Sequence, residues 1–216
     1  MLVGYFLRAP LESLLHYERM YCAKVSKERR GWFPKIMVAY FSFRGKNGRL
    51  KLAVEFDDVA RVKQALNEGA NPDGQVEREG DTLLLDVLCI GGLSNRYEIA
   101  KLLLEHGADP NLKDDEGTTA LMAAMRDLSS KLPLLLLQHG ADPNLKDNKG
   151  MTVLMHATGC ASVETIQLLL QSGAKVGDVN SKGKTALDLA KEYNHKKVAD
   201  LLETVMSQSA TNNGNR

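Results

Sequence analysis

Residues 104–117 read LEHGADPNLKDDEG and residues 137–150 read LQHGADPNLKDNKG, so one segment returns, with residue 104 matching 137 and residue 117 matching 150. Shorter copies occur at residues 66–72 and 170–175. The glycines of this signature are Gly69, Gly107, Gly140 and Gly173, which gives spacings of 38, 33 and 33. A fixed period of this length indicates a repeat architecture, in which each unit packs on its neighbours.

A second signature, Gly-x-Thr-x-Leu, precedes each of the later units. Its threonines are Thr82, Thr119, Thr152 and Thr185, which gives spacings of 37, 33 and 33. A threonine in this place is predicted to cap a first helix, because its hydroxyl accepts a hydrogen bond from an unpaired backbone N–H. The glycine of the first signature is predicted to end a second helix, since glycine adopts the left-handed conformation that often follows a helix. Asp-Pro and Gly positions between the two signatures predict tight turns.

These residues and spacings resemble the ankyrin repeat, a family with a 33-residue period and a Thr-Pro-Leu-His-x-Ala motif. The resemblance implies an all-α fold: an ankyrin-repeat solenoid of helix-turn-helix units joined by β-hairpin-like turns, covering residues 47–206. The first unit has Gly48 where the capping threonine belongs, and the second has four extra residues around 91–96. Residues 207–216 are expected to form a disordered polar tail. The five expected units span residues 47–79, 80–116, 117–149, 150–182 and 183–206.

Residues 1–46 differ from the repeats in charge and in aromatic content. Residues 1–51 hold 11 Lys or Arg and three Asp or Glu, whereas residues 52–216 hold 17 and 24. Ten of the 12 aromatic residues precede residue 57. We interpret residues 1–46 as a non-repeat, basic, aromatic-rich N-terminal extension that caps the solenoid, since its first unit needs a cover for its outer side. The alternatives are a partner- or membrane-docking element, an ill-ordered extension, and an F-box, to which the segment bears a faint likeness.

Composition favours a protein without disulfides or membrane spans. The 216 residues are 44% hydrophobic and 25% charged with a formal net charge of +1, so no global field would draw the chain to nucleic acid. Three scattered cysteines do not make a disulfide framework. No stretch approaches the roughly 20 apolar residues of a membrane span. We therefore expect a cytoplasmic and monomeric protein, with no nucleic-acid partner.

No residue pattern predicts a catalytic, cofactor or metal site. His106 and His139 share one register in successive units. Stacked helices lie about 8–10 Å apart, which is too far for a zinc ion with ligands at about 2 Å. His156 has Cys160 four residues on, but one such pair does not make a metal site or a nucleophile. The chain also contains no phosphate loop, nucleophile elbow or dinucleotide fingerprint. We expect no cofactor and no enzymatic activity.

The resemblance implies a non-enzymatic protein–protein interaction module that binds a protein partner on a concave face of turn tips and first helices. The alternative is an adaptor or effector whose N-terminal segment recruits cellular machinery, such as a ubiquitin ligase, while the repeats bind a client. A bacterial effector of this kind would act in the host cytosol. Carrying the family's usual contact positions onto this sequence gives these partner-binding candidates: Arg78, Glu79, Asp81, Asp115, Glu116, Thr118, Arg126, Asp127, Asn148, Lys149, Met151, Ser181, Lys182, Lys184, Glu192 and Tyr193.

Overall fold

The computed structural model describes residues 45–74, 82–89, 93–125, 130–160 and 162–213. Within these ranges the chain forms pairs of helices, and the only β structure is isolated bridges. The first helices are α4 (Lys46–Glu55), α6 (Leu83–Cys89), α8 (Ala120–Ala124), α10 (Val153–Ala157) and α12 (Ala186–Glu192). The second helices are α5 (Val59–Asn67), α7 (Arg96–Glu105), α9 (Lys131–Gln138), α11 (Val163–Gln171) and α13 (Lys196–Asn213). The predicted all-α fold of repeated helix pairs is confirmed.

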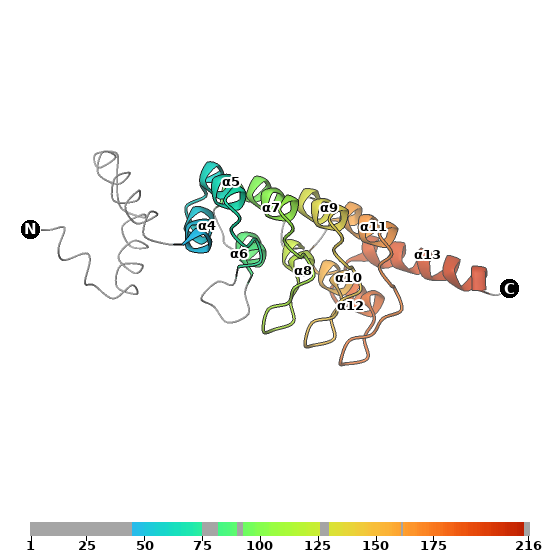
Figure 1. The fold of residues 1–216 in the computed structure, drawn as a ribbon. Helices are drawn as coiled ribbons and strands as arrows, with labels where there is room; N and C mark the ends of the chain where they lie inside the picture. Colours follow the sequence, from blue (N-terminus) through green and yellow to red (C-terminus); the bar gives the residue numbers. More distant parts are fainter. Residues whose placement is uncertain (1–44, 75–81, 90–92, 126–129, 161, 214–216) are drawn as a thin grey trace, which may run out of the picture. The chain divides into compact units, whose positions relative to one another are not determined.

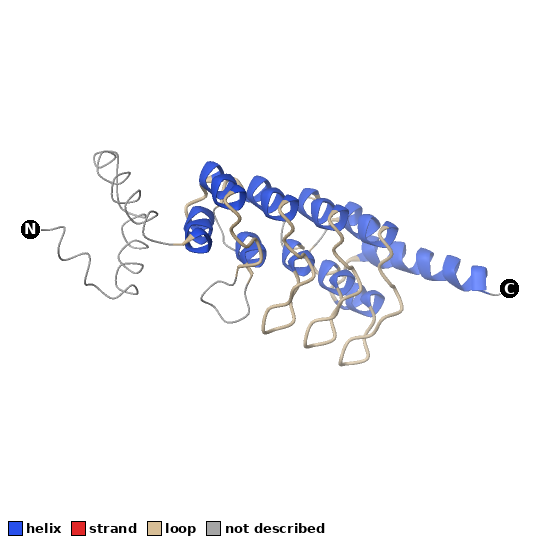
Figure 2. Ribbon diagram, viewed as in Figure 1, coloured by secondary structure: helices blue, strands red, loops and turns tan. Residues whose placement is uncertain are grey.

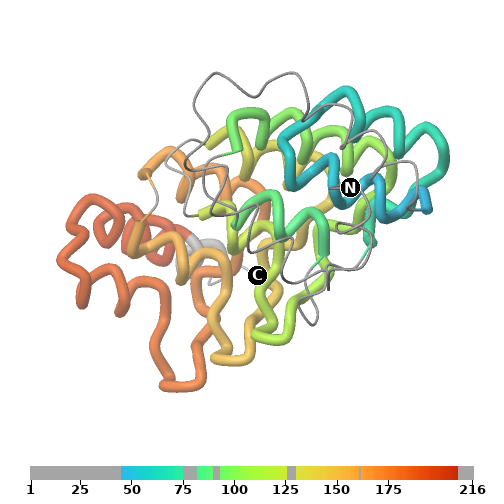
Figure 3. Tube along the Cα trace, turned by 90° about the vertical axis from the view of Figure 1, so that its left-hand side faces the viewer, coloured from blue at the N-terminus to red at the C-terminus, as the bar shows by residue number. Residues whose placement is uncertain are grey.

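The helix pairs stack into two layers. Helices α6, α8, α10 and α12 contact one another in sequence, as do α5, α7 and α9 in the other layer. Figure 1 shows the second helices in one row and the first helices in a parallel row beneath them. The loops between units project from the row of first helices, and Figure 2 draws them in tan. Figure 3, turned by 90°, shows the same loops extending together from the stack.

The structure confirms the helix ends that the threonine and glycine signatures predict. The threonine that precedes each of α6, α8, α10 and α12 accepts a hydrogen bond from the backbone N–H three residues on, at 3.2–3.5 Å. The glycines that follow α5, α7, α9 and α11 have φ angles between 80° and 90°. Between units, antiparallel bridges join Lys113 to Thr119 and Lys146 to Thr152. The expected hairpin-like turns are therefore present.

The core is a repeated row of leucines in each layer. Leu121 and Leu154, in α8 and α10, are 1% and 0% exposed. Leu103, Leu136 and Leu169, in the second helices, are each 0% exposed. Successive leucines within each row occupy the same position of successive units, so the period of the sequence is also the period of the apolar contacts. Full burial of one such side chain contributes roughly 1.5–3 kcal/mol.

The structure corrects two expected boundaries. Helix α4 begins at Lys46 with Gly45 as its N-cap, so the first unit starts slightly before residue 47. Helix α13 continues to Asn213, so the prediction of disorder from residue 207 is wrong for residues 207–213. The helix continues because no proline or glycine occurs before Gly214, and the hydroxyl of Ser207 donates to the carbonyl of Thr204 at 2.7 Å.

The expectations for the N-terminal extension fall on residues 1–44, which lie outside the described residues. The cap, docking-element and F-box interpretations of that segment therefore stay predictions. In the part of the chain that the structure describes, no helix has the length and apolar character needed to cross a bilayer.

Candidate functional site

The turn tips that precede α8, α10 and α12 are named here the third, fourth and fifth tips, after the units whose first helices follow them. Each tip is organised by one side chain in the same register. The Oδ1 atom of Asp114 accepts hydrogen bonds from the N–H groups two and four residues on, at 2.9 and 2.7 Å. Asp147 does the same at 2.8 and 2.8 Å. Asn180 does so at 2.9 and 3.0 Å. These residues are one repeat period apart, so each tip has the same internal hydrogen bonds and presents its next residues in the same direction.

Neighbouring tips are also bonded to one another. The backbone N–H of Asn148 donates to the carbonyl of Glu116 at 3.0 Å, and its side-chain amide donates to the carbonyl of Asp115 at 2.8 Å. The N–H of Ser181 donates to the carbonyl of Lys149 at 3.0 Å. The three tips therefore form one connected row, so the charges that they carry have fixed spacing.

The tip row is acidic at one end and basic at the other. Asp115 and Glu116 at the third unit are exposed, as are Lys149 and Lys182 at the fourth and fifth. Among the described residues, none of these four side chains forms an ion pair. The charges are therefore available to a partner, and adjacent charges of one sign reinforce each other.

Other lysines beside the tips are engaged within the protein. The Nζ of Lys113 donates to the carbonyl of Lys146 at 2.8 Å, and the Nζ of Lys146 lies 3.3 Å from Asp178. The Nζ of Lys184 donates to Glu192 at 2.6 Å, and this bond raises the pKa of Lys184. Lys184 and Glu192 thus neutralise each other, although both were predicted as partner contacts.

A pocket of about 460 Å³ opens between α10 and α12. Unit five contributes Tyr193 and His195, and Met151 lines the pocket from the fourth tip. Tyr193 is 49% exposed, which makes it one of the few exposed large apolar side chains in the described residues. The rest of the lining comes from α10 and the turn that follows it: Met155, His156, Gly159 and Cys160.

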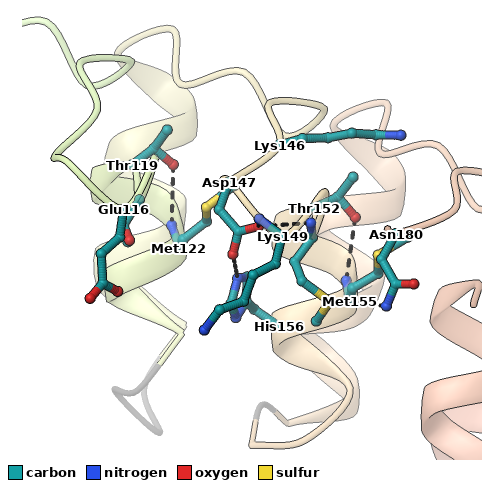
Figure 4. A network of polar contacts seen from close by, with 12 residues as sticks. Glu116, Thr119, Met122, Lys146, Asp147, Lys149, Thr152, Met155, His156 and Asn180 are labelled. Carbon is teal, nitrogen blue, oxygen red and sulfur yellow. Dashed lines mark hydrogen bonds and ion pairs between the residues drawn. The ribbon is translucent and has the colours of Figure 1, made fainter. Parts of the chain in front are cut away.

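One ring nitrogen of each pocket histidine and the thiol of Cys160 already have partners inside the protein. The Nε2 of His156 donates to the Oδ2 of Asp147 at 2.9 Å, as Figure 4 shows. The Nδ1 of His195 lies 2.6 Å from the carbonyl of Thr158. The thiol of Cys160 donates to the carbonyl of Met125 at 3.2 Å. The apolar part of the lining consists of thioether and aromatic surface, from Met151, Met155 and Tyr193.

Among the sequence-predicted candidates, the structure brings Asp115, Glu116, Asn148, Lys149, Ser181 and Lys182 together at the tips. Thr118 lies beside the third tip and is half-buried. Met151 and Tyr193 meet in the pocket. Five candidates fall outside the described residues: Arg78, Glu79, Asp81, Arg126 and Asp127.

Sequence reasoning missed Asp147, and it missed most of the pocket lining. Asp147 had a signal, since it shares its register with Asp114 and Asn180. His156 had none, because the equivalent positions of the preceding and following units hold Ala123 and Leu189. The described residues include no group of three or more His, Cys, Asp or Glu that could hold a metal ion.

One acidic group in the fifth unit has a shifted pKa. The carboxylate of Asp188 accepts hydrogen bonds from the backbone N–H of Thr185 at 2.9 Å and from its hydroxyl at 2.7 Å. These bonds stabilise the charged form and hold the pKa of Asp188 below its ordinary value. The pair forms a capping box at the start of α12, so its role is structural.

Comparison with known proteins matches this architecture. The family model for ankyrin repeats (three copies) matches residues 50–147 and 128–212. The chain belongs to the ankyrin repeat family. Ankyrin repeats are generally protein-interaction modules and are typically non-catalytic.

Two curated relatives share part of the ankyrin repeat region. Human 2-5A-dependent ribonuclease is 40% identical over 86 residues, which are 40% of this chain and 11% of that protein. Mouse 2-5A-dependent ribonuclease is 38% identical over 72 residues, or 33% and 9% of the two chains. The chain thus spans about a tenth of the length of these relatives.

Proposed function

We propose that this chain is a non-enzymatic interaction module that binds a protein partner on the concave face of units three to five. That face consists of the tip row and the exposed ends of α8, α10 and α12. The observation that carries the proposal is the tip row itself, in which four charged side chains without an ion pair to any described residue stand on a hydrogen-bonded backbone. Fixed, exposed charges of this kind favour recognition of a complementary protein surface.

The tip row is also pre-organised. Each tip is closed by its own Asp or Asn side chain and is bonded to the next tip, so binding orders little additional backbone. Since ordering of loops opposes association, a row that is already ordered favours affinity. A partner with a basic segment beside an acidic one would match the charge order from Asp115 to Lys182.

The experiment is a quantitative affinity purification of the full chain from its native cell. The wild type is compared with a variant that carries Asp115→Lys and Glu116→Lys. The matched control is Lys131→Glu, an exposed position at the start of α9 in the other layer. We expect one set of partners to be lost from the tip variant and kept by the control. Equal recovery of all proteins by both variants would contradict the proposal.

The proposal extends to a cytosolic, monomeric protein without nucleic-acid ligands. The adaptor or effector alternative depends on residues 1–46, and specific binding by that segment alone would support it. No feature of the described residues favours the alternative over the interaction module.

A further inference from the structure

We infer that the pocket between α10 and α12 receives one apolar side chain of the partner, and that acidic residues flank this anchor in the partner's sequence. The inference rests on the proposed function, because it specifies the partner's chemistry at the same concave face. It commits to an extended peptide segment of a protein as the occupant.

The apolar character of the anchor follows from the pocket lining. The imidazole of His156 is bonded to Asp147, and that of His195 contacts the carbonyl of Thr158. A polar anchor directed at these two nitrogens would therefore have to compete with bonds that already exist. Met151 and Tyr193 present apolar surface instead, over a floor that includes Met155, which is 1% exposed. Methionine surfaces adapt to the shape of the group that they receive, and aromatic side chains are frequent anchors of binding energy.

The acidic flanks follow from the charges at the pocket edge. Lys149 lies two residues before Met151, so their Cα atoms are at most about 7 Å apart. The backbone bond from Ser181 to Lys149 brings the fifth tip, with Lys182, next to the fourth. Both ammonium groups are exposed and without an ion pair among the described residues. The carboxylate of Asp147 is 8% exposed and accepts three hydrogen bonds within the protein, so it presents little surface to a partner.

These distances set the spacing in the partner. An extended peptide advances about 3.3 Å per residue. An Asp or Glu within three residues of the apolar anchor would therefore reach Lys149 or Lys182. Asp115 and Glu116 lie one unit further along the tip row, so they contribute to a different part of the contact.

The test uses the full chain and a library of random linear peptides displayed on phage. We expect enriched peptides to share a Met, Leu or Phe with Asp or Glu within three residues. Synthetic copies of these peptides would then be measured by fluorescence anisotropy. Gly159→Leu should weaken binding about tenfold or more by filling the pocket, a loss equivalent to about 1.4 kcal/mol. A Cβ at Gly159 meets the Tyr193 ring at 3.5 Å and the carbonyl of His156 at 3.9 Å, both ordinary contact distances, so the fold should tolerate this change.

A second pair of variants tests the flanks, and a thiol readout locates the peptide. Lys149→Glu with Lys182→Glu should weaken acidic peptides and shift the selection toward Lys or Arg, whereas Lys131→Glu should change neither. Bound peptide should slow alkylation of Cys160, which lines the pocket, and leave exposed Cys89 unaffected. Tyr193→Ala replaces Gly159→Leu if thermal unfolding shows that the leucine variant is damaged.

The outcomes separate this inference from the proposed function. An absence of enrichment, or enriched peptides without the apolar and acidic pattern, would overturn the inference. Peptides that ignore the pocket variants but respond to Asp115→Lys with Glu116→Lys would overturn it and leave the proposed function standing. Peptides that ignore every concave-face variant would count against both.

Discussion

The imidazole of His156 donates a hydrogen bond to Asp147 at 2.9 Å, and this bond links the first helix of unit four to its turn tip. The other carboxylate oxygen of Asp147 accepts the N–H groups of Lys149 and Met151. One side chain therefore holds the backbone that carries the charge of Lys149 and the pocket wall at Met151. The recognition proposed at the tip and at the pocket would therefore depend on the same residue.

Replacement of Asp147 should separate these two roles. Asp147→Ala removes all three acceptor contacts and should cost about 1–3 kcal/mol in the free energy of unfolding. Asp147→Asn should cost less, because Asn180 makes the same two backbone contacts at the fifth tip. In a His156→Ala background, Asp147→Asn should be almost neutral. Urea unfolding of the wild type, Asp147→Asn, His156→Ala and the double variant measures the coupling energy between the two side chains. If Asp147→Asn costs the same with and without His156, the bond between them contributes nothing to stability.

The leucine rows should dominate stability. Leu154 is fully buried, so Leu154→Ala should cost about 2–5 kcal/mol and lower the thermal midpoint. Lys149 is an exposed residue of the tip before α10, so Lys149→Ala should change the free energy of unfolding by no more than about 0.5 kcal/mol. Comparable losses from the two changes would mean that the assigned register is wrong.

The tip-to-tip contact should be measurable with two glycines. Gly117 and Gly107 both have positive φ, at 78° and 90°. A Cβ at Gly117 would lie 2.8 Å from the backbone nitrogen of Asn148, whereas a Cβ at Gly107 would have no described atom within 4 Å. Alanine at either position should cost about 1–2 kcal/mol for its left-handed backbone. Gly117→Ala should cost more, and the excess in chemical denaturation reports the contact between tips. Equal costs would argue that the tips do not touch.

Acid should weaken the start of α12. The pKa of Asp188 is held below its ordinary value, so its contribution is complete above the unfolded pKa of about 3.9 and is lost as the pH falls through the folded pKa. Asp188→Ala should therefore be less stable than the wild type at pH 7, by less than about 1 kcal/mol because the group is exposed to solvent. The difference should shrink below about pH 4. Urea midpoints at several pH values test this, and a difference independent of pH would exclude the carboxylate as its source.

Charge reversal at the third tip should act mainly on association. Asp115→Lys with Glu116→Lys should slow binding of the native partner several-fold at low salt, because steering depends on the long-range field. The effect should fade as salt screens the charges. Stopped-flow or surface-based kinetics measures it, with thermal unfolding as the check on the fold. A rate that ignores both the reversal and the salt would remove the acidic tip from the recognition surface.

The periodic part of the molecule could be predicted from its sequence. The capping threonines located four of the five first helices, and the glycines located four of the five second helices. The pocket could not be predicted in the same way, since His156, Cys160 and His195 each occur once in their register and produce no periodic signal. The contacts of Cys160 with Met125 and of His195 with Thr158 span 35 and 37 residues of sequence and arise only when the units stack, whereas the bond from His156 to Asp147 joins a helix to its own tip.

The error at the C-terminus has a different origin. The polar composition after residue 206 predicts disorder, but polar residues other than proline and glycine do not end a helix that has already formed. Helix α13 is nucleated by buried residues such as Val198 and Leu202. Once started, it extends through Ser and Thr residues whose hydroxyls donate to carbonyls of their own helix, as at Thr204.

The bonded tip row also bears on how such a chain can evolve. Residues 147–179 hold one tip and the helix pair that follows it, and the same register starts again at residue 180. The backbone of this tip donates to the tip before it, from Asn148 to Glu116, and accepts from the tip after it, from Ser181 to Lys149. An in-frame duplication of residues 147–179 would therefore insert a unit whose two flanks already match their new neighbours. Gene duplication would then lengthen the row in one step, without any compensating mutation elsewhere.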